Sequence, residues 1–439
     1  MENKKLLPLI IKMSIPPALS MLIQSLYNII DSIYITNYDQ KAMEAISLVY
    51  PIQNIILAIA VGIGIGINAY VSMKLGEKKP KEAANAATLG IILSCLHYLI
   101  VLIAGLAVSG IFIRSFTKDE TVIEYGLTYI NLMIVFSFTT IIQIAMEKIL
   151  QADGKMLLPM ISLLVGTITN VILDPLLIFN AQMGILGAAI ATVAGQVLAT
   201  IVMTYFVFSK RNSIRLSFRG FKVDKASLAA IYKVGIPSIF INAIPSIMVS
   251  AMNYILVGVN DTAVTTFGIY YKLQYFVYMG VSGISQGTMP IMGYCFGAKN
   301  QQRLNQTIKD SVLLSFGIGV ASMILFLSIP NLLMAMFYKD SALIESTNNL
   351  LRIASVSFMF GCVSYILASY FQAVQKGFLS FIITMLRQLI LLLPIAYALQ
   401  LGLNEFGIYL ALPISEALAL GVAAILFLHT KKRLSQSLT

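Results

Sequence analysis

Long apolar runs, separated by short polar segments, fill almost the whole chain. Each run reaches or exceeds the roughly 20 residues that an α-helix needs to cross about 30 Å of hydrocarbon. Cutting the sequence at charged residues and at clusters of Gly, Pro and Asn predicts twelve such helices. They cover approximately residues 12–37, 45–73, 84–112, 122–151, 156–179, 185–208, 231–258, 265–294, 307–336, 342–373, 377–400 and 406–429. We therefore expect an all-α polytopic membrane protein with twelve transmembrane helices.

The two halves of the chain repeat each other at a constant offset of 221 residues. Pro16 corresponds to Pro237 and Gly62 to Gly283 at this offset. Six helices in each half give both halves the same orientation, with a pseudo-two-fold axis along the membrane normal. We expect an N-lobe of six helices at 1–208, a cytoplasmic linker at 209–230 and a C-lobe of six helices at 231–439. The basic linker is expected on the anionic lipid surface.

Composition agrees with a membrane protein, and the distribution of charge predicts its orientation. Apolar residues make up 58% of the chain and charged residues only 11%, against about 25% charged in soluble domains. Most of the 30 Lys and Arg residues fall on the side that holds both termini, which indicates cytoplasmic termini. The net charge of +11 therefore reflects topology, and no nucleic-acid partner is expected. We expect a bacterial inner membrane location.

Enzyme motifs have little support. The 3 cysteines and 2 histidines supply neither a disulfide framework nor a metal-ligand set. Gly283 to Gly287 spell G-x-S-x-G inside a predicted helix, where a hydrolase needs a strand-to-helix turn. We interpret these glycines as packing surfaces. The alternative is an intramembrane serine protease that uses Ser282 or Ser285. No ATP-binding P-loop is present, so uphill transport must use an ion gradient; we expect no enzyme activity and no cofactor.

The first predicted helix carries polar residues at a helical spacing. Gln24, Tyr27, Asn28 and Asp31 stand at i, i+3, i+4 and i+7, which places them along one face of the helix. An ionisable side chain inside a membrane is costly and is by default a functional hypothesis. Pro16, near the start of this helix, is interpreted either as a hinge or as a packing kink.

Similar patterns occur in the fifth and sixth predicted helices. The fifth carries Asn170 and Asp174, and the sixth carries Thr192 and Gln196. No Lys or Arg lies inside the membrane in the first half, so nothing neutralises Asp31 and Asp174. We predict that this pair carries a proton or, with Asn170 and Thr192, binds a small cation such as Na⁺. The alternative is that these polar side chains only form hydrogen bonds between helices. For Tyr27 and Gln196, both interpretations stay open.

The second half carries its own buried charges. Lys272, Arg352 and Glu416 each lie about ten residues from the predicted outer surface. We predict a buried ion-paired cluster that either stabilises the lobe or recognises substrate. Arg387 falls in the inner half without an obvious carboxylate partner.

The sequence resembles the multidrug and toxic compound extrusion (MATE) transporters, in their bacterial DinF-like and MepA-like branch. The resemblance covers the whole chain and is most specific at Pro16, at 24–31 (Q-S-L-Y-N-I-I-D), at 170–175 (N-V-I-L-D-P) and at 187–192 (G-A-A-I-A-T). It implies a cation site of Asp31, Asn170, Asp174 and Thr192 lined by Gln24 and Tyr27, and a coupling bend at Pro16. Other branches place acidic residues in the seventh, eighth and tenth helices, where this chain has Asn253, Lys272 and Arg352. Coupling through the second half is therefore not expected.

These observations lead to one functional hypothesis and its alternatives. We expect a monomeric secondary active antiporter that exports amphipathic, cationic drugs across the lipid bilayer in exchange for H⁺ or Na⁺. Lys272 and Arg352 favour the alternative of a flippase for lipids or lipid-linked oligosaccharides. A passive channel is a further alternative, distinguished by whether flux runs uphill.

Overall fold

The computed structural model describes residues 5–210, 212–218, 221–259, 261–335 and 341–436, and in these ranges every regular element is a helix. The predicted all-α class is therefore confirmed. Four residues used in the topology prediction, Lys4, Arg211, Arg219 and Lys339, lie outside the described residues.

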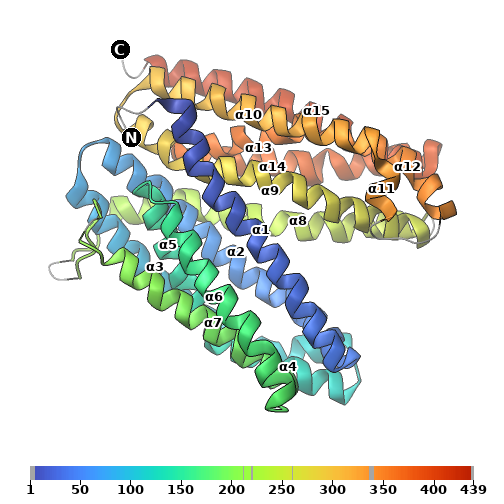
Figure 1. The fold of residues 1–439 in the computed structure, drawn as a ribbon. Coiled ribbons are helices and arrows are strands. Elements are labelled where there is room, and N and C mark those ends of the chain that lie inside the picture. The colour runs from blue at the N-terminus through green and yellow to red at the C-terminus, as the bar shows by residue number, and fades with distance from the viewer. Residues whose placement is uncertain (1–4, 211, 219–220, 260, 336–340, 437–439) are drawn as a thin grey trace. The chain divides into compact units, whose positions relative to one another are not determined.

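The first six predicted helices correspond to eight helical elements (Figure 1). They are α1 (Leu6–Tyr38), α2 (Gln40–Gly76), α3 (Pro80–Phe116), α4 (Glu120–Val135), α5 (Ser137–Ala152), α6 (Leu157–Pro175), the π-helix η1 (Leu176–Asn180) and α7 (Gly184–Val207). The fourth predicted helix is bent by 45° between α4 and α5. The fifth is α6 continued by η1.

The second six predicted helices are broken more often. The elements are α8 (Lys225–Val257), α9 (Asp261–Gly297), α10 (Gln301–Ser328), α11 (Pro330–Ala335), α12 (Ser341–Ser355), α13 (Ser357–Ala373), α14 (Gly377–Met385), the π-helix η2 (Leu386–Ile390) and α15 (Leu392–Gln436). The last two predicted helices meet inside α15, at Asn404, where φ is 50° and the chain is not helical.

Nine helical segments in the described part of the chain are long and apolar enough to span a membrane, or ten with the bent pair. One of them, Gly377–Leu434, contains two predicted helices in its 58 residues. The 37-residue α9 does not reach this threshold, because Lys272, Gln274 and several Ser and Thr residues lower its hydropathy. With these two differences, all twelve predicted helices are present.

The chain forms two compact units, and both divisions fall inside a helix. One unit contains Leu19–Ile239, and the other contains Met1–Ala18 and Phe240–Thr439. The division in α8 is 221 residues after the division in α1, so the two occupy equivalent positions of the repeat. The start of each half's first helix thus packs with the other half's helices. The boundaries of the N-lobe, linker and C-lobe at residues 208 and 230 remain predictions.

Glycines allow this packing within each unit. A β-carbon at Gly62 would collide with Ile239, and one at Gly66 would collide with Ile231 and approach Gly235. In the other unit, a β-carbon at Gly283 would collide with Ala18. The glycines that repeat between the halves are therefore close-packing positions, as predicted.

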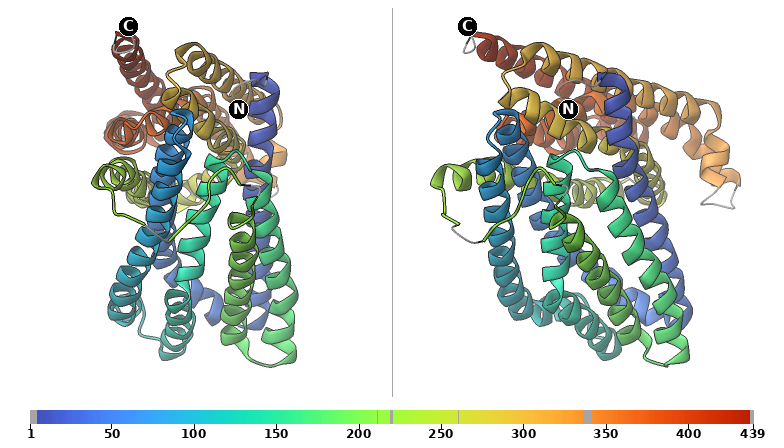
Figure 2. Two further views of the ribbon diagram at one scale, coloured as in Figure 1. Left: turned by 90° about the vertical axis from the view of Figure 1, so that its left-hand side faces the viewer. Right: turned by 60° about the vertical axis from the view of Figure 1, so that its left-hand side comes forward.

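Between α7 and α8, the described residues 208–210, 212–218 and 221–224 form no helix (Figure 2), and some of them bind α3. Asn85 Nδ2 donates to the carbonyl of Lys222 at 3.1 Å, and the amide of Ser217 donates to Thr88 Oγ1 at 3.3 Å. Ile214 is only 2% exposed. Part of the linker thus packs on protein; its contact with lipid remains a prediction.

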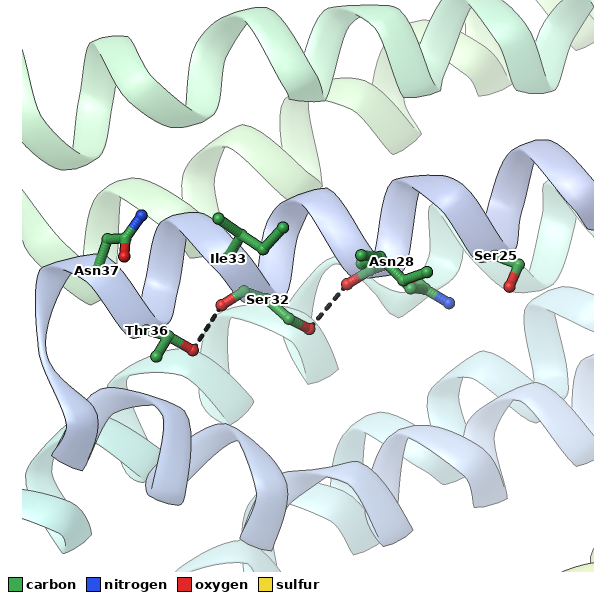
Figure 3. Close-up of a pocket in the computed structure, with 7 residues that line it drawn as sticks. Ser25, Asn28, Ser32, Ile33, Thr36 and Asn37 are labelled. Carbon is green, nitrogen blue, oxygen red and sulfur yellow. Dashed lines mark hydrogen bonds between the residues drawn. The ribbon is translucent and has the colours of Figure 1, made fainter. Parts of the chain in front are cut away.

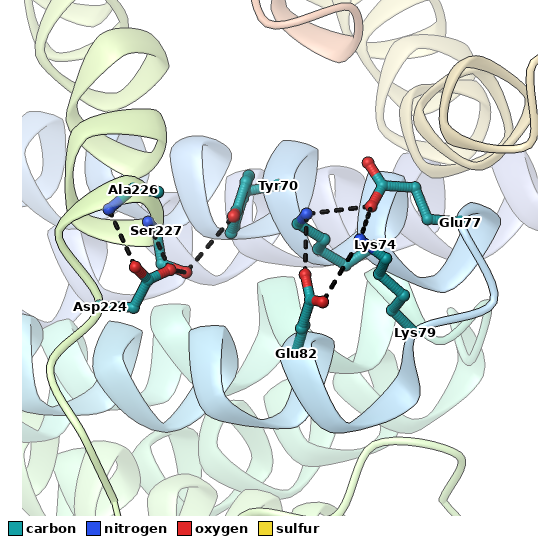
Figure 4. Close-up of polar contacts among 8 residues, drawn as sticks. All are labelled: Tyr70, Lys74, Glu77, Lys79, Glu82, Asp224, Ala226 and Ser227. Atoms are coloured by element: carbon teal, nitrogen blue, oxygen red, sulfur yellow. Dashed lines mark hydrogen bonds and ion pairs between the residues drawn. The ribbon is translucent and has the colours of Figure 1, made fainter.

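Polar side chains fix the start of α8 in the same unit (Figure 4). Asp224 accepts hydrogen bonds from the amides of Ala226 and Ser227 at 3.1 and 3.0 Å, which is an N-cap arrangement. The Ser227 hydroxyl contacts Tyr70 of α2 at 3.4 Å. One turn further along α2, Lys74 forms an ion pair of 2.9 Å with Glu82 of α3.

Candidate functional site

The two aspartates predicted to act together lie together in the unit Leu19–Ile239. Asp31, on α1, and Asp174, in the last turn of α6, lie within hydrogen-bonding reach of each other. Asp174 is fully buried and Asp31 is partly buried. In the part of the chain that the structure describes, neither forms an ion pair with Lys, Arg or His. The site therefore holds two carboxyl groups and no fixed positive charge.

Asn170 and Thr192 complete the predicted set. Asn170 Nδ2 lies 3.4 Å from Asp174 Oδ1 and 3.3 Å from Thr192 Oγ1. The Thr192 hydroxyl donates to the carbonyl of Ala188 at 3.0 Å, so its oxygen is free to accept from Asn170. Asn170 is 2% exposed and Thr192 is 7% exposed. All four side chains predicted for the cation site are thus in one place.

Three acceptor oxygens at this site have no hydrogen-bond donor in the described part of the chain. They are Asp31 Oδ1, Asn170 Oδ1 and Asp174 Oδ2, and each is buried. Buried polar atoms without partners are rare in folded proteins and point to an unseen proton or ion. Oxygen ligands suit a hard cation. The described residues include no group of three His, Cys, Asp or Glu that could hold a metal ion.

Local helix geometry positions Asp174. Pro175 follows it and has no amide hydrogen to donate to Val171, and the chain continues as the π-helix η1. Such π-helical segments occur frequently at functional sites. The neighbouring α7 packs closely because Gly195 approaches the backbone of Gly166. This contact brings Thr192 near Asn170.

Two further residues at the site were not identified from the sequence. Tyr129, on α4, is 3% exposed and has its hydroxyl within hydrogen-bonding reach of Thr192 and of Gln53 on α2. Tyr27, which the sequence did indicate, also reaches Thr192. Gln53 occurs in the internal repeat, but neither it nor Tyr129 shares a polar stripe with a charged residue. Only the packing of α2 and α4 against α7 reveals them.

The polar stripe of α1 divides between two faces. Tyr27 and Asp31 are partly buried, whereas Gln24 and Asn28 are exposed. Asn28 lines a groove of about 500 Å³ on α1, where Ser32 and Thr36 donate to the carbonyls one turn earlier (Figure 3). The residues that line this groove are Ser25, Asn28, Ile29, Ser32, Ile33, Thr36 and Asn37. The structure therefore brings Tyr27 to the aspartates and does not bring Asn28 there.

Gln196 lies one turn beyond Thr192 and binds a different helix. Its Oε1 accepts a hydrogen bond from Thr139 Oγ1 of α5 at 3.3 Å. Thr200, a further turn along α7, donates to the carbonyl of Thr139 at 3.2 Å. These contacts favour the alternative of interhelical hydrogen bonding for Gln196.

The predicted ion-paired cluster of the second half is wrong in its partners. Glu416 pairs with Arg387, with Nη2 2.8 Å from Oε1, and not with Lys272 or Arg352. Both of these are exposed and have no ion pair among the described residues. The sequence placed Arg387 in the inner half without a carboxylate partner, whereas the structure places it in the π-helix η2 beside Glu416.

Ser282, the residue directly before the G-x-S-x-G run, has hydrogen-bond partners on two helical segments. Ser282 Oγ accepts from Tyr365 and from Gln286, each at 3.4 Å. No histidine takes part in these contacts. The arrangement supports the interpretation of this run as a packing surface.

Comparison with known proteins agrees with the duplication. The MatE family model matches residues 16–176 and again residues 237–398; the two matches begin 221 residues apart. "Multidrug export protein MepA" of Staphylococcus aureus (strain bovine RF122 / ET3-1) is 24% identical over 419 residues, covering 95% of this chain and 92% of its own length.

Solved structures share the fold. A structure described as "Crystal structure of MATE in the bent conformation" aligns with a TM-score of 0.94 at 22% identity and covers 100% of both chains. A Pyrococcus furiosus protein, described by "Reverse polarity of binding pocket suggests different function of a MOP superfamily transporter", aligns with a TM-score of 0.92 at 22% identity, covering 99% of this chain and 100% of its own. Because the family model matches most of the sequence in two successive copies, this chain belongs to the MatE family of transporters.

Proposed function

We propose that this protein is a secondary active antiporter that exports amphipathic, cationic drugs in exchange for H⁺ or Na⁺. The coupling site consists of Asp31, Asn170, Asp174 and Thr192, with Tyr27 beside it. The observation that supports it best is the group of three buried oxygens without donors, on Asp31, Asn170 and Asp174. A transported proton or cation would satisfy these oxygens without a fixed counter-ion.

The chemistry of the site gives a mechanism. With the site empty, two neighbouring carboxylates repel each other, and the repulsion is strong because little water screens it. A proton or Na⁺ that enters from outside removes this repulsion and draws Asp31 of α1 toward Asp174 of α6. Drug and cation then favour different conformations, and by linkage each weakens the binding of the other.

Pro16 is the proposed hinge for this movement. α1 remains a continuous helix through Pro16 and Pro17, yet the chain passes from one compact unit to the other between Ala18 and Leu19. A proline inside a helix removes one backbone hydrogen bond and lowers the cost of bending. A bend here would carry the displacement of Asp31 to the start of α1.

The proposed substrate class rests on two observations. The related S. aureus protein is named as a multidrug export protein. The groove on α1 is an open surface lined by hydroxyl, amide and apolar groups of this helix without a cation. Ser32 and Thr36 donate their protons within the helix, so they present acceptor oxygens that suit a cationic ligand.

The cellular setting follows from the same proposal. A multi-pass protein with the predicted charge distribution places both termini in the cytoplasm of a bacterial cell, with the protein in the plasma membrane. We propose that a monomer transports, because each chain carries a complete cation site. The protein then needs no cofactor besides the coupling ion.

Flux measurements in proteoliposomes test the proposal. A fluorescent organic cation such as ethidium is loaded, and a proton gradient or a Na⁺ gradient is imposed separately. The proposal expects that one of these gradients drives ethidium against its own concentration gradient. Flux that only runs downhill would indicate a channel, and an absence of flux with either gradient would contradict the proposed function.

A flippase for lipids or lipid-linked oligosaccharides is the second candidate. The exposed Lys272 and Arg352, on α9 and α12, favour it because exposed cations can bind phosphate groups. Transfer of a fluorescent anionic phospholipid between leaflets measures this activity. If Lys272→Gln and Arg352→Gln abolish that transfer and leave ethidium flux unchanged, the flippase is the correct assignment.

A further inference from the structure

The unit that contains residues 240–439 has a buried charge centre of its own. Arg387, in η2, donates from Nε to Glu416 Oε1 and Oε2 at 3.1 and 2.9 Å, and from Nη2 to Oε1 at 2.8 Å. Arg387 is 4% exposed and Glu416 is 7% exposed. Arg387 Nη2 also donates to the hydroxyl of Tyr278 at 2.9 Å. The carboxylate is therefore fully matched by a guanidinium of the same chain.

A glycine beside this centre leaves room for Tyr278 and Glu416. A β-carbon at Gly361, on α13, would collide with the Tyr278 hydroxyl and would lie 3.1 Å from Glu416 Oε1. Tyr278, Arg387 and Glu416 come from three different helical segments, α9, η2 and α15. The Arg387–Glu416 pair is therefore closely packed, and residues from three helical segments fix its orientation.

The repeat shows what this centre replaces. At the offset of 221, Asp31 corresponds to Met252 and Asp174 to Ile395, so the second half has lost both unpaired carboxylates. The position equivalent to Gly166 is Arg387. In the first half, Gly166 only allows α7 to approach α6. The first half thus has a pair of acids without a counter-ion among the described residues, whereas Glu416 in the second half has a counter-ion supplied by the chain.

We propose that Arg387 acts as a tethered cation that occupies the Glu416 carboxylate in place of H⁺ or Na⁺, so that each transport cycle is coupled only through Asp31 and Asp174. This inference rests on the proposed function, because it concerns the ratio of cations to substrate. Arg387 is a positioning residue in this account, since it acts through Glu416. Because Arg387 is part of the chain, the second half does not exchange a cation during transport.

The groups around Glu416 explain why Arg387 is the deciding residue. α9 presents Tyr270 and Tyr278, and α13 presents Cys362. All three are neutral when protonated, and none can supply a positive charge. If Arg387 is replaced by a neutral residue, Glu416 is left as a buried carboxylate without a cation, and such groups generally bind a proton instead of remaining charged.

Variants at the pair separate this role from a purely structural one. Arg387→Met removes the charge and keeps much of the volume, while Arg387→Met combined with Glu416→Gln removes both charges. We expect a protonated carboxyl band in the infrared spectrum of purified Arg387→Met at neutral pH. That band should be absent from the double variant and from Arg387→Lys, which restores a cation.

Transport gives the second readout. In proteoliposomes, the double variant should keep the wild-type number of cations exchanged per ethidium and an efflux rate within about twofold, because a buried pair can often be replaced by neutral groups. In Arg387→Met, the efflux rate should show an additional change at acidic pH that wild type lacks. Arg387→Lys should have the wild-type pH profile. If Arg387→Met does not fold, the double variant still decides the question through its cation ratio.

Two results would overturn the inference. One is an Arg387→Met protein that folds and shows no additional protonated carboxyl. The other is a folded double variant that exchanges fewer cations per ethidium, because the pair itself would then take part in coupling. A wild-type protein that shows no gradient-driven efflux would contradict the proposed function and leave the infrared test of Glu416 valid.

Discussion

Asp31 of α1 and Asp174 of α6 lie within hydrogen-bonding reach of each other, and no Lys, Arg or His in the described part of the chain forms an ion pair with either. Two carboxylates in so small a volume cannot both remain ionised at low cost without a proton or cation between them. This pair is the central feature of the account, and the predictions below test its parts and its surroundings.

Removing one carboxylate should stabilise the protein when no cation is bound. In Na⁺-free buffer at pH 8.5, Asp174→Asn should raise the melting temperature, because it removes the repulsion with Asp31; each 1 kcal/mol corresponds to about 2–4 °C in a protein unit of this size. Addition of the coupling cation should then stabilise the variant less than it stabilises wild type. Asp310→Asn is the control, since Asp310 accepts a hydrogen bond from Gln306 near the start of α10 and lies outside the aspartate site. A variant that melts below wild type in the absence of cation would contradict the repulsion.

The hydroxyl of Tyr129 should contribute to cation binding. Tyr129→Phe removes a buried group that reaches Thr192 and Gln53, and the loss of one such hydrogen bond costs about 0.5–1.5 kcal/mol. We expect the coupling cation to bind up to about tenfold more weakly, measured as the cation concentration that gives half-maximal efflux. Tyr125→Phe is the matched control on the same helix, because the Tyr125 hydroxyl donates to Asp39, one turn before Tyr129 on α4. Equal effects of the two variants would argue against a role of Tyr129 at the site.

Gly66 should be intolerant of a larger side chain. A side chain at this position of α2 would collide with the backbone of Ile231, and Gly235 lies beside it, and overpacking of this kind typically costs 1–3 kcal/mol. Gly66→Val should therefore lower the melting temperature of the purified protein by several degrees. Gly110→Val is the control, because no atom lies within 4 Å of a β-carbon at Gly110. If both variants melt at the wild-type temperature, the helices are not packed as described.

The start of α8 should loosen in acid. Hydrogen bonds from the side chain and amide of Ser227 and from the amide of Ala226 lower the pKa of Asp224. A lowered pKa in the folded state gives stability that is present above the ordinary carboxyl value, near pH 4, and is lost as the pH falls through the lowered value. Hydrogen exchange at the first turn of α8 should accelerate in this acidic range. Asp224→Asn should lose this pH dependence, and an unchanged profile would contradict the capping role.

The sequence alone was sufficient for the helices and for the aspartate site, because both depend on regular spacing. Asn170 and Asp174 lie one turn apart on α6, and the absence of membrane-embedded cations in the first half is visible without a structure. The structure confirms that these side chains meet, although their role in coupling remains a proposal.

Other features of the site depend on side-chain packing, which the spacing of residues along the sequence does not reveal. Asn28 is three residues from Asp31, which turns it about 60° around the helix, and this is enough to place it in the groove of α1. Arg387, the partner of Glu416, lies in the π-helix η2, which the spacing of polar residues along the sequence does not predict. Tyr129 lies on a helix with no unusual polar pattern, and only its neighbours identify it.

The most direct test of the central claim is uphill efflux by Asp31→Asn. Proteoliposomes containing wild type or Asp31→Asn receive the same ethidium load and the same gradient of the coupling ion, with equal amounts of folded protein confirmed by gel filtration. The account predicts that wild type moves ethidium against its concentration gradient and that Asp31→Asn only lets ethidium equilibrate. Gradient-driven uphill efflux at the wild-type rate in Asp31→Asn would contradict the assignment of the aspartate pair as the coupling site.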